Sequence, residues 1–264
     1  MRTTFLNLPT EYGYPIGFTY GTSNDIAFVT FGTNSTSVNI PHQTYLAVLD
    51  ASDFTPSVLH VIHYPYAETG PQGAPHIALA NRGDYLYTSA GYGAIVTNAE
   101  RAIRKHPDAI VGYLNGSTAT LLGGDDGFGV VVSGEERYVF VIMEQASANV
   151  TIGNVDVFAL NPPACDGRVT GTSIGHIILD MAVTDGVLSP DDRYFYASSE
   201  TAGIDSSHTS LLPGVIDVLD VGRLETDPST ALLTNATGDC GSTRLARSLT
   251  RARSCGSLTA AATR

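Results

Sequence analysis

The sequence has very little positive charge and no long apolar run. Lys105 is its single lysine, and the 264 residues carry a net charge of −12. Proteins that bind nucleic acid use clustered lysine and arginine to contact phosphates, so this balance argues against a nucleic-acid partner. No apolar stretch approaches the length that spans a membrane, which argues against a membrane partner. The oligomeric state stays open.

Familiar catalytic signatures are also missing. We find no phosphate-binding glycine loop, no His-Glu-x-x-His and no Rossmann fingerprint, and a Gly-x-Ser-x-Gly nucleophile elbow is not expected. Cys165, Cys240 and Cys255 lack metal-ligand spacing, and three cysteines fix no disulfide framework. These absences favour catalysis by binding and polarisation over covalent catalysis. They predict neither a cofactor nor a metal.

What the sequence does contain is a repeated pattern. Four segments each predict a short apolar strand, a polar turn and a second strand rich in Tyr, Phe and Val. Their anchor residues Ile26, Tyr85, Tyr138 and Tyr194 follow one another at intervals of 59, 53 and 56 residues. The four segments are 16–29, 74–87, 128–141 and 186–196.

Further strands follow each segment. Third strands are expected at 45–50, 110–114, 155–160 and 215–220, with weaker fourth strands such as 58–62 and 173–178, and one short helical insertion at 98–106. A period near 50 with four strands per unit is typical of a β-propeller. A two-sheet sandwich also has many short strands, but it has no reason to repeat its turn at a fixed period. We therefore predict an all-β fold, a β-propeller of four-stranded antiparallel blades.

The two ends of the chain differ from its middle. No apolar stretch of signal-peptide length follows Met1, so the protein is cytoplasmic or its true start lies upstream. A secreted protein would agree with the four Asn-x-Ser/Thr glycosylation acceptors. These are Asn34, Asn115, Asn149 and Asn235.

No acidic residue follows Asp239, and the run after Ser248 lacks strand alternation. If the reading frame is shifted by one base at Ser248, the codons that follow can encode Ser-Pro-Asp and then a Val-rich strand. Such a sequence would continue a fifth blade. The alternative is a natural irregular tail. We expect residues 1–13 to be an extension, 14–248 to form blades and 249–264 to be irregular. The chain then holds about four blades of a ring that needs six or seven.

Two motifs resemble a known family. The Pro-His-x₆-Gly-x₃-Tyr arrangement at 75–87 and Leu-Ser-Pro-Asp-Asp-Arg-Tyr-Phe-Tyr at 188–196 resemble the blades of lactonase-like propellers with YVTN-type repeats. The resemblance covers residues 14–248, and many members of that family are secreted fungal proteins. In general character the chain also resembles the hetero-Diels–Alderases of tropolone sesquiterpenoid biosynthesis.

That resemblance implies a cofactor-free enzyme of fungal secondary metabolism with an apolar small-molecule substrate. Its most specific form joins a tropolone-derived o-quinone methide to a sesquiterpene alkene in a hetero-Diels–Alder cyclisation. A lactone hydrolase is the first alternative. A non-catalytic propeller that binds glycan or protein is the second.

Strand order predicts where a site would lie. Loops that lead into the innermost strands and loops that leave the second strands share one face of a propeller, and loops on a rigid scaffold commonly bind ligands. The expected catalytic residues are His76, Glu144 and Arg244. The expected substrate-binding residues are Tyr92, Asp126, Phe128, Asp185, Glu200 and His208.

Each of these residues also has a structural interpretation. In the structural interpretation, His76 only caps the strand or hydrogen-bonds to backbone groups. Asp126 and Asp185 precede glycine, where an aspartate commonly forms an Asx turn. Glu144 directly follows an apolar strand, so it can point into the channel. Asp125, Asp126 and Asp185 could hold calcium, but no sequence-local calcium loop is present.

Overall fold

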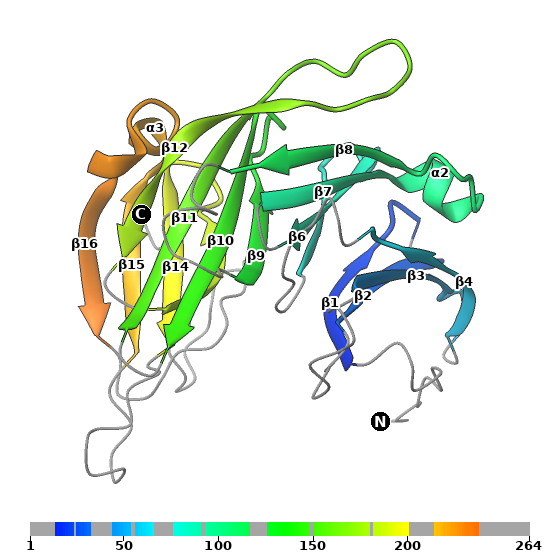
Figure 1. Cartoon of the computed structure of the whole chain (residues 1–264), viewed down its shortest axis with the longest axis horizontal. Helices are drawn as coiled ribbons and strands as arrows, with labels where there is room; N and C mark the ends of the chain where they lie inside the picture. Colours follow the sequence, from blue (N-terminus) through cyan, green and yellow to red (C-terminus); the bar gives the residue numbers. More distant parts are fainter. Residues whose placement is uncertain are drawn as a thin grey trace, which may run out of the picture.

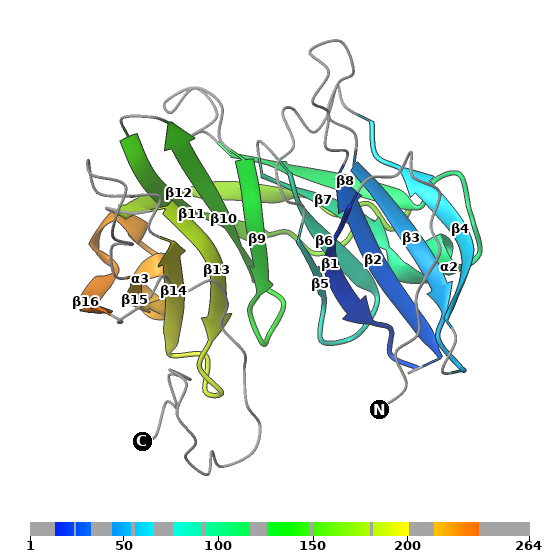
Figure 2. The same cartoon turned by 90° about the horizontal axis from the view of Figure 1, so that it is seen from below.

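The strands form four antiparallel sheets of four strands each, and neighbours in sequence are neighbours in every sheet. The sheets stand side by side along an arc, with the first and fourth at opposite ends (Figures 1 and 2). The predicted fold is therefore confirmed: the chain is an all-β propeller whose four blades leave the ring open. The computed structural model describes residues 14–23, 25–32, 44–53, 56–65, 76–90, 93–116, 126–147, 150–179, 182–200 and 214–237.

Each blade takes its strands in chain order. Blade 1 contains β1 (Tyr14–Tyr20), β2 (Ile26–Gly32), β3 (Thr44–Asp50) and β4 (Ser57–His63). Blade 2 contains β5 (Ile77–Leu79), β6 (Tyr85–Ala90), β7 (Gly93–Asn98) and β8 (Ile110–Asn115). Blade 3 contains β9 (Asp126–Val132), β10 (Tyr138–Ser147), β11 (Val150–Leu160) and β12 (Gly171–Leu179). Blade 4 contains β13 (Ala182–Leu188), β14 (Tyr194–Glu200), β15 (Val215–Asp220) and β16 (Leu232–Thr237).

The anchor tyrosines occupy equivalent places, as predicted. Tyr85, Tyr138 and Tyr194 each begin the second strand of a blade. Their carbonyl oxygens accept hydrogen bonds from the backbone N–H groups of Ala80, Ser133 and Ser189 at 2.9, 3.0 and 2.8 Å. One turn geometry therefore closes the first hairpin of three blades, which explains why its sequence repeats.

Blade 2 corrects one predicted strand. Residues 110–115 form the fourth strand, and the third strand is β7, which the sequence analysis missed because its glycine and alanine start resembles a loop. A side chain at Gly93 would lie 1.8 Å from the Leu114 carbonyl oxygen, so only glycine fits there. The predicted helical insertion is confirmed as α2 (Ala99–Ile103), which begins after Asn98. The Asn98 side chain accepts a hydrogen bond from the backbone N–H of Arg101 at 2.9 Å.

Two further short elements follow β15 in blade 4. They are α3 (Val221–Leu224) and the 3₁₀ turn η3 (Pro228–Thr230). The Asp220 side chain caps α3 as Asn98 caps α2, by accepting the backbone N–H of Arg223 at 2.9 Å. Among the described residues, no helix is long and apolar enough to cross a membrane.

Among the described residues, three hydrophobic clusters lie between neighbouring blades, and a fourth, which contains Phe31, lies on blade 1 alone. We call the face of a blade that meets the next blade its trailing face, and the face that meets the preceding blade its leading face. The trailing faces of the first three blades carry an aromatic residue paired with a valine, and all six residues are at most 2% exposed. The pairs are Phe28–Val48, Tyr87–Val96 and Phe140–Val157.

Each pair packs against the leading face of the next blade. Phe28 and Val48 share a cluster with Leu86 and Ile95 of blade 2. Tyr64, directly after β4, adds a buried polar link at that junction, because its hydroxyl lies 3.3 Å from Thr88 Oγ1 and 3.1 Å from Thr97 Oγ1. Burial raises the pKa of Tyr64 to about 12, so its hydroxyl stays protonated and able to donate.

Candidate functional site

The first strands of the blades contact one another, so they line the inside of the arc. Three of them contain a β-bulge near their start. The residue after each bulge pairs with the fifth residue of the adjacent second strand: Gly17 with Thr30, Gly129 with Ile142, and Asp185 with Ser198. Bulges commonly redirect side chains beside active sites.

His76 takes the same place in blade 2. Its carbonyl oxygen accepts the backbone N–H of Ser89, the fifth residue of β6, at 2.9 Å. We call Gly17, His76, Gly129 and Asp185 the bulge ring. Its two members with polar side chains, His76 and Asp185, are both partly buried. Both residues were predicted from the sequence as site residues, and the register shows that they are structurally equivalent.

Hydroxyl groups of the second strands hold the bulge ring. The N–H of His76 donates to Ser89 Oγ at 2.9 Å, and the N–H of Gly17 donates to Thr30 Oγ1 at 3.0 Å. A side chain at Gly17 would lie 3.0 Å from the Cα of His76, so β1 and β5 approach backbone to backbone. The Asp185 carboxylate accepts the N–H of Gly186 at 2.8 Å. His76 and Asp185 thus have fixed backbones.

Other predicted residues reach the same end of the blades. Asp126 and Glu144 are register partners in β9 and β10, and Glu200 pairs with Ala182 at the start of β13. Phe128 is the extra residue of the blade 3 bulge and is partly buried. The backbone therefore gathers most of the predicted site residues at one face.

Five of these residues were expected in loops and lie in strands instead. Asp126 and Phe128 belong to β9, Glu144 to β10, Asp185 to β13 and Glu200 to β14. The glycines beside Asp126, Phe128 and Asp185 resemble loop sequence, but ladder hydrogen bonds need only backbone groups, so pairing continues through these positions. Tyr92, His208 and Arg244 lie outside the described residues, as do Asn34, Asn149 and the tail after residue 237.

Other expectations concern the surface and metals. Asn115 and Asn235 are exposed, each in the fourth strand of its blade. Cys165 is an exposed free thiol. Within the part of the chain that the structure describes, no three His, Cys, Asp or Glu side chains are grouped to hold a metal ion.

One motif was overlooked in the sequence. Gly171-Thr172-Ser173-Ile174-Gly175 matches Gly-x-Ser-x-Gly. It lies inside β12, the outermost strand of blade 3, and not at the strand-to-helix turn that exposes a nucleophilic serine. Ser173 is therefore not placed as a nucleophile.

Two buried aspartates were also missed. Asp156 in β11 and Asp217 in β15 hold the same register position in blades 3 and 4, and they are 1% and 5% exposed. The Asn154 amide donates to Asp156 Oδ1 at 3.1 Å. A signal was present in the sequence, since an aspartate between apolar residues interrupts both third strands.

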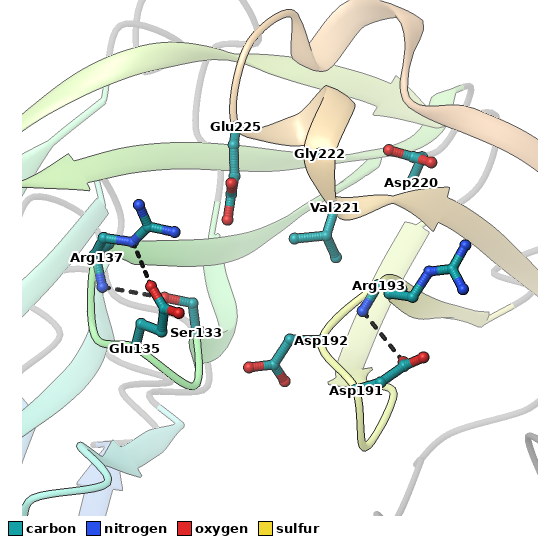
Figure 3. A pocket seen from close by; sticks show the side chains of 10 residues that line it. All are labelled: Ser133, Glu135, Arg137, Asp191, Asp192, Arg193, Asp220, Val221, Gly222 and Glu225. Carbon is teal, nitrogen blue, oxygen red and sulfur yellow. Dashed lines mark hydrogen bonds and ion pairs between the residues drawn. The ribbon is translucent and has the colours of Figure 1, made fainter.

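At the opposite end of the strands, on the side of the first-hairpin turns, lies a polar pocket of about 460 Å³ (Figure 3). It lies between the first-hairpin turns of blades 3 and 4 and the start of α3. Carboxylates outnumber guanidinium groups around it. The residues that line it are Ser133, Glu135, Arg137, Asp191, Asp192, Arg193, Asp220, Val221, Gly222 and Glu225.

The turns beside this pocket lock neighbouring blades together. Asp192 Oδ2 accepts the N–H of Gly134 at 2.7 Å, and Glu136 Oε1 accepts the N–H of Arg82 at 2.5 Å. Glu136 and Asp192 both have positive φ, at 56° and 53°, and so does Gly83 at the equivalent position of blade 2. An acid at this left-handed position therefore reaches back to the turn of the preceding blade.

Glu225 is the perturbed group of this pocket. Burial raises its pKa above the usual range; the Arg137 guanidinium opposes the rise, while the Glu135 and Asp192 carboxylates add to it. The three aspartates here accept backbone N–H groups, and Glu135 forms an ion pair with Arg137 at 2.9 Å, which is the chemistry of a structural junction. The bulge ring is the better candidate for a functional site.

Comparison with known proteins supports the fold alone. No family model and no curated protein matches the sequence. Hydrazine synthase from Kuenenia stuttgartiensis is similar in structure, with a TM-score of 0.55 and 15% identity over 87% of this chain and 51% of that chain. The chain thus spans about half the length of that protein.

Two other solved structures give lower scores. Sqt1 from Chaetomium thermophilum has a TM-score of 0.48 and 13% identity over 81% of this chain and 44% of that one. The β-propeller domain of Cps50 (Swd1) from Myceliophteria thermophila has a TM-score of 0.39 and 11% identity, over 85% and 73%. At such identities a likeness concerns architecture, and the architecture of this chain is that of a β-propeller.

Proposed function

We propose that the chain belongs to a small-molecule enzyme whose site lies at the bulge ring, with His76 and Asp185 as its reacting groups. The observation that carries the proposal is their shared register. Asp185 follows the bulge of β13, His76 lies at the equivalent position of blade 2, opposite the fifth residue of β6, and both residues are partly buried. An imidazole and a carboxylate at the same register position of two blades can act as general base and general acid.

Hydrolysis of a lactone fits these groups best, and the resemblance to lactonase-like propellers implies the same activity. His76 would take a proton from water as the water oxygen attacks the lactone carbonyl. The ring C–O bond then breaks, and the proton passes to the leaving alkoxide to give a hydroxy acid. The Asp185 carboxylate would stabilise the imidazolium. Asp126 and Glu144, which pair in the intervening blade, are the further candidates for proton transfer.

The hetero-Diels–Alder cyclisation is the second proposal. It needs two apolar reactants held together and one donor that polarises the enone oxygen of the o-quinone methide. Phe128 favours this alternative, because its ring is partly buried at the level of the bulge ring. His76 would then serve as a hydrogen-bond donor without transferring its proton.

The full chain should be assayed with a series of lactones, with release of hydroxy acid measured at constant pH, and separately with an o-quinone methide and an alkene. We expect His76→Ala and Asp185→Asn to lower lactone turnover by about 10- to 1000-fold with an unchanged circular dichroism spectrum. Matched controls are His63→Ala and Asp25→Asn, whose side chains are exposed in blade 1.

The outcomes separate the alternatives. Full activity of both bulge-ring variants would refute the site. Formation of the cycloadduct without lactone hydrolysis would favour the second proposal. Ligand binding without turnover would point to a non-catalytic propeller.

A further inference from the structure

The fifth residue of the second strand carries a hydroxyl group in three of the four blades. These residues are Thr30, Ser89 and Ser198, and blade 3 has an isoleucine there. In blades 1 and 2 the hydroxyl accepts the N–H of the bulge-ring residue opposite, at 3.0 and 2.9 Å. Both polar groups of each pair are thereby satisfied.

Ser198 in blade 4 departs from this pattern. The residue is 0% exposed, and among the described residues its hydroxyl oxygen has no hydrogen-bond partner. A buried hydroxyl without a partner is costly, because it has lost its hydrogen bonds to water. An unpaired group of this kind in a folded protein calls for a specific explanation, and a role in a functional site is one.

The register places Ser198 directly opposite Asp185. Residues that face each other in an antiparallel pair point to the same side of the sheet, with Cβ atoms about 4.5–5.5 Å apart. A hydroxyl and a carboxylate can reach each other over that separation, and a serine side chain changes the direction of its Oγ by one step between staggered rotamers.

The backbone around this pair is well held. Thr184, the extra residue of the bulge, donates from Oγ1 to the Ser198 carbonyl oxygen at 3.5 Å. Asp185 Oδ1 accepts the N–H of Gly186 at 2.8 Å. An ionised carboxylate has about four acceptor sites on its two oxygens, so the bond to Gly186 leaves room for a second donor.

We propose that Ser198 is a positioning residue, whose hydroxyl donates a hydrogen bond to the Asp185 carboxylate. A carboxylate held by the Gly186 N–H and by this hydroxyl keeps one direction, which pre-organises it to stabilise the imidazolium of His76. The inference rests on the proposed function, because it states how one reacting group of that site is held. The contact itself can be tested without activity.

A double-mutant cycle on the full chain tests the contact. Urea unfolding is measured for Ser198→Ala, Asp185→Ala and the double variant. We expect Ser198→Ala to lower the urea midpoint when Asp185 is present and to lower it no further in the Asp185→Ala background. An unchanged or higher midpoint with Asp185 present would overturn the proposal, because the removal of a hydroxyl that binds nothing relieves a cost.

Ser199→Ala is the matched control for the cycle. Its hydroxyl is buried in the same strand but donates to the Val215 carbonyl oxygen at 2.9 Å. This variant should lower the midpoint equally in both backgrounds, since its partner is not Asp185. Coupling of the same size for Ser199→Ala would mean that Asp185→Ala disturbs the whole strand, and it would overturn the specific contact.

Lactone turnover tests the role in positioning. Ser198→Ala should lower kcat by about 10-fold with an unchanged KM, and Ser198→Thr should restore it, because threonine keeps the hydroxyl. In the Asp185→Asn background Ser198→Ala should cause no further loss. An equal loss in that background would overturn the proposal, because Ser198 would then act independently of Asp185. Coupled unfolding together with full turnover of Asp185→Asn would confirm the contact and refute the proposed function.

Discussion

The trailing faces of blade 3 and blade 4 have nearly the same residues but different surroundings. Phe140 and Val157 in blade 3 are fully buried against blade 4, whereas Tyr196 and Val218 at the same positions are only partly buried. A propeller blade is thus not a self-sufficient unit. Its sheet gains most of its stability from the hydrophobic area that the next blade covers.

The largest expected effect tests this comparison directly. Phe140→Ala should destabilise the chain by about 3–5 kcal/mol, because it empties a closed space in the core between two blades. Tyr196→Ala should cost about 1–2 kcal/mol, because a partly exposed ring leaves no closed cavity when it is removed. Urea unfolding of both variants at high dilution, where any association is weak, measures the difference. Equal losses would mean that the trailing face of blade 4 is covered in solution.

A second prediction concerns the turn that joins these blades. Asp192→Ala should cost about 2 kcal/mol, because it removes a charge-assisted bond to the Gly134 N–H and leaves a non-glycine residue at a φ of 53°. Asp192→Gly should cost less, since glycine adopts that φ without strain.

Asp191→Ala is the matched control for this turn. Asp191 is exposed, and the hydrogen bonds that its carboxylate accepts come from Ser189 and Arg193 of its own turn. Thermal unfolding of the three variants gives the order. If Asp191→Ala is as damaging as Asp192→Ala, the turn matters only for its own hairpin and not for the junction.

The smallest effect is a pH dependence at the same junction. The pKa of Glu225 is raised in the folded protein, so the folded state binds more protons than the unfolded state and loses stability as pH rises above the ordinary value of 4.5. Glu225→Gln should therefore stabilise the chain at neutral pH and make no difference in strong acid. A series of melting temperatures against pH checks this. A gain that persists in strong acid would assign the effect to packing instead of charge.

The sequence by itself determined the blade count and the hairpins. Tyr85, Tyr138 and Tyr194 mark the second strands because each follows the same hydrogen-bonded turn, and a local turn leaves a local signature. It also located His76 and Asp185, because the order of strands along the chain fixes which strand ends share a face.

Only the tertiary structure decided which of these residues are equivalent and which aromatic rings form the core. The pairing of first with second strands relates His76 to Asp185, because their partners Ser89 and Ser198 are each the fifth residue of a second strand. Phe28, Tyr87 and Phe140, two residues after the first three anchors, are among the buried rings. Their burial depends on a neighbouring blade some fifty residues away in the sequence, and no local pattern records that contact.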